Sequence, residues 1–214
     1  MRSRFDEQLA LLNRDLTKMG SLCEEALALA AKALANADGQ TAAKIAPIDS
    51  EIDQMERTIE SLCLKLLLQQ QPVARDLRQI SAALKMITDM ERIGDQASDI
   101  AEIIGFLNGR IGTDAQYICQ MAVAAMRMVT ESVEAYVKRD VAMAEATIQH
   151  DDVVDDLFLK VKESLIQMIS ANPKDGEYAL DLLMIAKYFE RIGDHATNIA
   201  EWVVFSVTGV HEQG

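Results

Sequence analysis

The sequence has few of the residues that interrupt helices. Only 3 of its 214 residues are proline and 10 are glycine, and aromatic residues make up 5%. A fold of many short strands needs more turn formers and more bulky side chains, so these shortages exclude a many-turned all-β protein. Half of the residues are hydrophobic, which argues against disorder and predicts a substantial core.

Positive charge is also scarce. Twenty-one lysines and arginines face 34 acids, for a net charge of -13. Binding to nucleic acid relies on clustered basic residues, so we expect no nucleic-acid partner, and an anionic lipid surface suits this chain poorly. No stretch reaches the ~18 apolar residues of a membrane span. The acid-bearing N-terminus lacks the apolar segment of a signal peptide, so we expect contact with a membrane through partners only.

The three cysteines lie far apart and form no CxxC motif. An odd number of cysteines without a spacing pattern is typical of reduced thiols, which predicts a cytoplasmic protein. We expect Cys23, Cys63 and Cys119 to lie in the core.

Between widely spaced breakers, the hydrophobic pattern is helical. In residues 48–66, for example, apolar side chains recur every three or four positions, which is the stripe of an amphipathic helix. The breakers fall at residues 36–39, 71–72, 105–113, 138–140, 172–176 and 209. The sequence therefore predicts an all-α fold of six long helices, with Asp140, Asp175 and Thr113 as N-caps.

The two halves of the sequence are related. Residues 91–102 (ERIGDQASDIAE) reappear as residues 190–201 (ERIGDHATNIAE), identical at nine of twelve positions and offset by 99. Upstream the offset is 102, and it aligns Asp38 with Asp140. We expect two tandem three-helix bundles, over residues 1–108 and 113–208, each large enough to fold alone.

Acidic residues recur on the third helix of each half. At ~100° per residue, Glu91, Asp95 and Glu102 continue the direction of the apolar stripe that includes Ile80. Glu190, Asp194 and Glu201 repeat this layout in the second half. The residues expected to face solvent in the first half are Lys85, Asp89, Arg92 and Gln96.

The second helix of each half carries a matching pair of acids. Asp49 and Asp53 are four residues apart and lie on one edge of the helix, and Asp151 with Asp155 repeats this. Carboxylates brought together repel, and a hard or borderline cation would relieve the repulsion. The candidate metal ligands are Asp49, Asp53, Glu91, Asp95, Asp151, Asp155, Glu190 and Asp194.

Structural explanations for the same residues remain open. Acidic pairs are common on solvated helix faces, and Arg92 or Arg191 could bridge to an acid of the next helix. The mid-helix glycines Gly94 and Gly193 indicate close helix packing, since each costs about 1 kcal/mol relative to alanine. The Glu-x-x-His motif of di-iron bundles, catalytic signatures, glycine-rich phosphate loops and arginine clusters are all absent from the sequence.

The repeated motif resembles the PhoU family of phosphate-regulation proteins. The resemblance rests on Glu91–Asp95 and Ile100–Glu102, on residues 190–201, and on the upstream aspartate pairs, and it covers nearly the whole chain. It implies two tandem three-helix bundles without enzymatic activity. It also implies a cytoplasmic regulator that associates with the phosphate ABC transporter and with a sensor histidine kinase, and that restrains both when phosphate is plentiful.

The resemblance further implies a homodimer, and a transition-metal cluster of iron, zinc or manganese on the eight acids named above. Asp99 in the first half is Asn198 in the second, so the two metal sites are expected to differ. We therefore expect an adaptor that couples the transporter to the kinase. The alternatives are a carboxylate-liganded metalloenzyme or metal-storage bundle, and an oligomeric coiled-coil scaffold.

Overall fold

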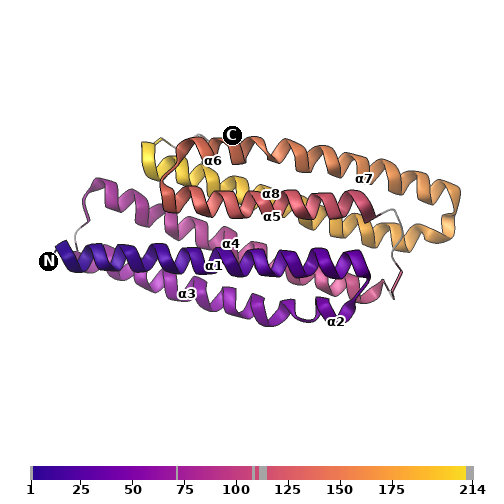
Figure 1. The fold of residues 1–214 in the computed structure, drawn as a ribbon, viewed down its shortest axis with the longest axis horizontal. Helices are drawn as coiled ribbons and strands as arrows, with labels where there is room; N and C mark the ends of the chain where they lie inside the picture. Colours follow the sequence, from indigo (N-terminus) through magenta and orange to yellow (C-terminus); the bar gives the residue numbers. More distant parts are fainter. Residues whose placement is uncertain (1, 71, 108, 111–114, 211–214) are drawn as a thin grey trace.

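The computed structural model describes residues 2–70, 72–107, 109–110 and 115–210, in which all regular secondary structure is helical (Figure 1). The first half contains α1 (Arg2–Asn36), α2 (Gly39–Ala42), α3 (Ile45–Gln70) and α4 (Ala74–Phe106). The second half contains α5 (Gln116–Lys138), α6 (Val141–Gln149), α7 (Asp151–Ala171), the 3₁₀ turn η2 (Pro173–Asp175) and α8 (Gly176–Thr208). The all-α prediction with six long helices is confirmed.

Aspartate caps explain the short helices α2 and α6 that follow the first helix of each repeat. Asp38 accepts a hydrogen bond from the Gln40 backbone N–H at 2.9 Å, and Asp140 accepts one from the Met143 N–H at 3.0 Å. Such caps satisfy backbone donors that have no partner within the helix. The expected cap at Asp140 is therefore correct, whereas Thr113 lies outside the described residues.

The expected cap at Asp175 is only partly correct. Asp175 does precede α8, but its carboxylate makes no hydrogen bond to the α8 backbone. It instead accepts hydrogen bonds from Arg110 at 2.6 Å and from the Asn172 amide at 3.0 Å. Because Arg110 lies 65 residues away in the sequence, local patterns favoured the cap and missed the ion pair.

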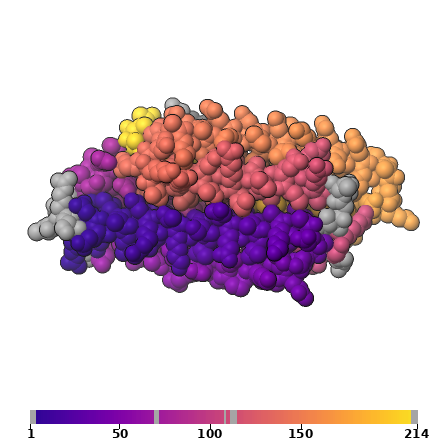
Figure 2. All heavy atoms as spheres, viewed as in Figure 1, coloured from indigo at the N-terminus to yellow at the C-terminus, as the bar shows by residue number. Residues whose placement is uncertain are grey.

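The two repeats pack side by side. Helices α4 and α8 pack along each other at the centre, α1 packs against α5, and α3 and α7 lie outermost (Figure 1). Figure 2 shows the two halves as adjacent slabs of an elongated molecule. One continuous core of buried apolar side chains, including Leu16, Ile52 and Phe189, runs through both repeats. Each repeat therefore buries part of its apolar surface against the other, and the expected boundary near residues 108–113 falls largely outside the described residues.

Helices α4 and α8 are related by a local twofold axis. Gln96 and His195, which are equivalent positions of the two repeats, approach each other with their Nε2 atoms 3.4 Å apart. Asp89 accepts a hydrogen bond from the Asn198 amide at 3.2 Å, and the equivalent pair, Asp99 and Tyr188, also interacts. Equivalent residues can contact each other in this way only where the axis passes between antiparallel helices.

This interface corrects the expectation that Asp89 and Gln96 face solvent. Gln96 is 3% exposed, and the Asp89 side chain is 15% exposed. A helical wheel drawn for one repeat does not show which face the other repeat covers.

In the described part of the chain, no helix is both long enough and apolar enough to span a bilayer.

Candidate functional site

The four predicted acids of the first repeat lie close together on α3 and α4. Asp49 is half-buried, and the Glu91 side chain is 21% exposed. Asp53 and Asp95 are more open, at 44% and 42%. Burial and then the charge of Asp95 raise the pKa of Glu91, and the same causes act on Asp49, where a hydrogen bond opposes them. The charges of these acids therefore act on one another between α3 and α4.

The four acids of the second repeat form an equivalent group on α7 and α8. The Glu190 side chain is 15% exposed, Asp151 is partly buried, and Asp155 and Asp194 are exposed. Burial and the charges of Asp194, Asp155 and Glu190 raise the pKa of Asp151 to about 6. Burial is the larger cause, and repulsion by the neighbouring carboxylates adds to it.

The motif glycines explain how the buried aspartates fit between helices. A Cβ at Gly94 would lie 2.7 Å from the Asp49 Oδ1 atom, and a Cβ at Gly193 would lie 2.9 Å from the Asp151 Oδ1 atom. Both distances are shorter than van der Waals contact. The close helix packing indicated by these glycines is confirmed, and the group that approaches the α4 or α8 backbone is the carboxylate itself.

The two repeats differ in how they hold this aspartate. The Ser98 hydroxyl donates to Asp49 Oδ2 at 2.7 Å, whereas at the equivalent position the buried Thr197 hydroxyl has no hydrogen-bond partner. In both repeats the Oδ1 atom, of Asp49 and of Asp151, is buried without a partner. A buried carboxylate oxygen without a donor is costly, and it has the chemistry of a cation ligand.

Each acidic group also has a basic neighbour. Arg92 pairs with Asp95 at 3.1 Å and with Glu91 at 3.5 Å, both on its own helix α4. In the second repeat the Lys187 Nζ atom lies 2.6 Å from Glu190. Both ion-pair partners of Arg92 lie on α4, so the alternative in which Arg92 bridges to an acid of the next helix is wrong. The first group is the more neutralised, since Arg57 also pairs with Asp53, at 3.5 Å.

The side chains as placed do not form a closed coordination sphere. Among the described residues, no three His, Cys, Asp or Glu side chains lie close enough to share a metal ion. The type of donor nevertheless suits a metal ion, because each repeat offers several carboxylates, one of which has a buried oxygen without a hydrogen-bond partner. Rotation of the exposed aspartates would be required to complete a site.

Sequence reasoning missed one residue near these acids and one contact across the repeat interface. Glu56 on α3 contributes to the repulsion at Glu91, and its position three residues after Asp53 is a signal that could have identified it. His195 lies at the repeat interface, where its Nδ1 atom is 2.9 Å from Asp89. Because Asp89 belongs to the other repeat, no sequence spacing indicates this contact.

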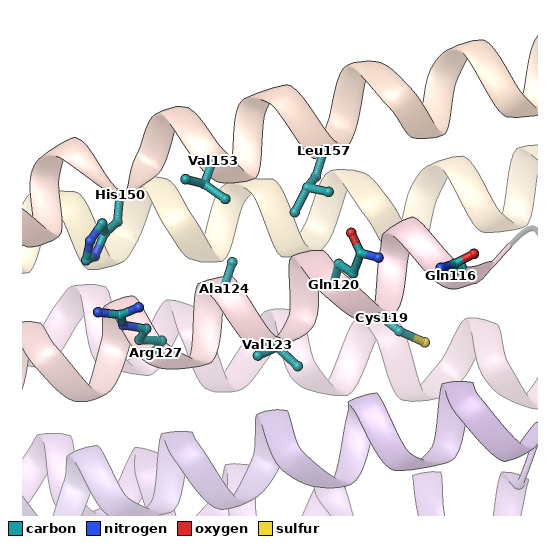
Figure 3. Close-up of a pocket in the computed structure, with 9 residues that line it drawn as sticks. All are labelled: Gln116, Cys119, Gln120, Val123, Ala124, Arg127, His150, Val153 and Leu157. Atoms are coloured by element: carbon teal, nitrogen blue, oxygen red, sulfur yellow. The ribbon is translucent and has the colours of Figure 1, made fainter.

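A separate apolar groove of about 670 Å³ lies between α5 and α7 (Figure 3). Val123, Val153 and Leu157 line it, and at one end Arg127 and His150 both pair with Glu131. Cys119, expected in the core, is only half-buried and lines this groove, whereas the other two cysteines are buried. The acids are not part of the groove.

Comparisons with known proteins agree with this arrangement. The family model "PhoU domain" matches the chain twice, over residues 16–104 and 118–203. The chain is 36% identical to a Phosphate-specific transport system accessory protein PhoU homolog of Clostridium acetobutylicum, over 97% of this chain and 96% of that protein. A Synechocystis protein of the same description is 36% identical, over 99% and 94% of the two chains.

Two solved structures have the same fold. The crystal structure of PhoU from Pseudomonas aeruginosa superposes with a TM-score of 0.92 at 33% identity, covering 96% of this chain and 100% of that one. The phosphate transport system regulatory protein PhoU from Streptococcus pneumoniae superposes with a TM-score of 0.88 at 26% identity, covering 98% and 99%.

Proposed function

Because the chain belongs to the PhoU family, we propose that it is a cytoplasmic accessory protein that restrains phosphate uptake and phosphate-starvation signalling. The observation that carries the proposal is the full-length similarity to proteins described as accessory to a phosphate-specific transport system. The protein acts as an adaptor, without catalytic activity, between subunits of the phosphate ABC transporter and a sensor histidine kinase.

The adaptor works by binding its partners differently in their two states. Coupling between transporter and kinase requires that this protein contact one partner more favourably when the other is in the phosphate-replete state. An elongated bundle with two equivalent repeats and one continuous core supports such a role, because it presents two related surfaces. The working form is a homodimer.

Metal binding by the acidic groups is the second part of the proposal. Asp49, Asp53, Glu91 and Asp95 hold a transition metal in the first repeat, and Asp151, Asp155, Glu190 and Asp194 hold one in the second. The orphaned Oδ1 atoms of Asp49 and Asp151 favour this assignment. A bound cation supplies charge neutralisation, and these side chains position it while the glycine beside each buried aspartate admits the carboxylate.

Co-purification tests the adaptor role. The protein, tagged at its C-terminus, is isolated from cells grown with ample or limiting phosphate, after crosslinking, and the transporter ATPase subunit and kinase are quantified by mass spectrometry. We expect both partners, in amounts that change with phosphate. If neither partner is recovered under either condition, the adaptor proposal is wrong.

Elemental analysis tests metal binding separately. Protein purified without chelator is compared with the Asp95→Ala/Asp194→Ala double variant, and an Asp6→Ala/Glu24→Ala variant controls for the loss of two acids. We expect reduced metal content in the first variant only. Equal content in all three would reject the metal sites and leave the adaptor role intact. Turnover of a phosphoester or of oxygen by the loaded protein would favour the metalloenzyme, and metal uptake without any partner would favour storage.

A further inference from the structure

Three arginines meet at one end of the molecule, although they are distant in sequence. Arg75 and Arg78 lie on the first turns of α4, three residues apart and so on one face of the helix. Arg139 ends α5 in the left-handed conformation, with φ at 57°. Its guanidinium donates to the Gln79 side chain at 3.2 Å, which places it beside both α4 arginines.

The charges in this cluster are poorly compensated. The Arg78 Nε atom is buried and has no hydrogen-bond partner. In the described part of the chain, Arg75 and Arg78 form no ion pair within 4.0 Å. Burial and then the charges of Arg75 and Arg78 lower the pKa of Arg139, and Asp76 is the neighbouring acid that opposes this. In a chain with a net charge of -13, such a concentration of positive charge requires an explanation.

The backbone beside the cluster is also positive. Helix α4 begins at Ala74, and the residue before it, Val73, provides no side-chain cap. The N–H groups of the first turn, with the helix dipole, favour an anion at this end. The Arg78 side chain lies against Gly209 at the end of α8, where the terminal carbonyls of that helix attract its guanidinium.

The second repeat provides an internal comparison. The local twofold axis relates this end of the molecule to the opposite end, where Arg75, Arg78 and Arg139 correspond to Lys174, Glu177 and Ala37. There Arg110 pairs with Asp175 at 2.6 Å. Positive and negative charges are thus matched at the opposite end. The excess of positive charge belongs to the first end alone and does not follow from the shared fold.

We propose that Arg75, Arg78 and Arg139 form a binding site for a phosphate group. Guanidinium groups bind the oxygens of a phosphate through pairs of charge-assisted hydrogen bonds, and among the described residues no carboxylate already pairs with Arg75 or Arg78. The phosphate group belongs either to inorganic phosphate or to an anionic phospholipid headgroup. This inference does not depend on the proposed function, since it rests on the charge distribution of the isolated protein.

Titration calorimetry of the full-length protein with inorganic phosphate tests the site, with sodium chloride as the comparison anion. The variant is Arg75→Gln/Arg78→Gln, and the control of equal charge is Lys44→Gln/Lys160→Gln, whose side chains are exposed elsewhere. Vesicles of phosphatidylglycerol, compared with phosphatidylcholine, provide the lipid arm in a flotation assay. Thermal melting verifies that each variant is folded, and Arg139→Asn, which tolerates a left-handed backbone, supplies a second variant.

The site would be supported, with inorganic phosphate as its ligand, by saturable phosphate binding that persists in the lysine control. This binding should weaken about tenfold or more in the arginine variants. Binding only to phosphatidylglycerol vesicles, with the same dependence on the arginines, would support it with a lipid headgroup. The proposal is overturned if neither probe binds, if chloride competes equally, or if the arginine variants bind like the wild type. Failure here would leave the co-purification of partners unaffected.

Discussion

Alanine at Gly94 provides the sharpest test of how the acidic site is built. In the interior of a helix, replacing glycine by alanine normally stabilises a protein by up to about 1 kcal/mol. Here the added Cβ would meet Asp49 Oδ1 at 2.7 Å and Ile52 Cδ1 at 3.0 Å. Overpacking of this kind typically costs about 1–3 kcal/mol, so we expect no gain and a net loss of up to about 2 kcal/mol.

The same helix contains a matched control. A Cβ at Gly105, in the last turn of α4, would meet nothing within 4 Å. Gly105→Ala should therefore keep or slightly raise the melting temperature, while Gly94→Ala lowers it. At about 2–4 °C per kcal/mol for a chain of this size, the two variants should differ by several degrees in a thermal melt followed by circular dichroism.

A double-mutant cycle tests whether the Asp49 carboxylate is the group that makes alanine at Gly94 destabilising. In an Asp49→Ala background the carboxylate is gone, so adding Gly94→Ala should cost less than it does in the wild type, by about 0.5 kcal/mol or more. Gly193→Ala should be milder, since its Cβ meets only Asp151 Oδ1 closely, at 2.9 Å, and Val154 no nearer than 3.5 Å. If Gly94→Ala stabilises the protein as Gly105→Ala does, or costs the same with and without Asp49, the carboxylate contact is not what requires glycine.

Three further predictions concern titration, the repeat interface and thiol reactivity. Because the pKa of Asp151 is raised from 3.8 to about 6, its contribution to stability falls as pH rises between those values. In metal-free protein Asp151→Asn should therefore raise stability above pH 6, by about 1 kcal/mol after allowance for solvent screening, and have little effect at pH 4. Asp49→Asn should gain less, and a gain for Asp151→Asn that is independent of pH would contradict the assignment. Asp89→Ala removes the acceptor for His195 and Asn198 and should cost about 1–3 kcal/mol in urea unfolding; an unchanged midpoint would show that this interface contact is not stabilising. Cys119 is the half-buried cysteine, so a thiol reagent followed by mass spectrometry should label it first in the native protein, and faster labelling of Cys23 would show that the packing is different.

The acidic site could be predicted in most of its parts from the sequence. The repeated motif, the four-residue spacing of the aspartates and the wheel direction of Glu91 together predicted two equivalent groups on neighbouring helices. These signals are local or repeated, and helical periodicity carries them directly. The differences between the groups could not be predicted, because the Ser98 hydrogen bond and the orphaned Thr197 hydroxyl depend on side-chain placement between α3 and α4 or between α7 and α8.

What the sequence by itself determined was the set of helices, their internal duplication and the acidic residues that the repeats share. Each can be read from the spacing of residues along the chain, because a helix with 3.6 residues per turn places regularly spaced residues on one face. Only the tertiary structure decided which faces meet. It placed Gln96 against His195 on a local twofold axis, moved Asp89 from solvent into an interface, and gathered Arg75, Arg78 and Arg139 from two helices. These residues are up to 106 positions apart, and contacts over such separations depend on how the repeats pack, which no local pattern encodes.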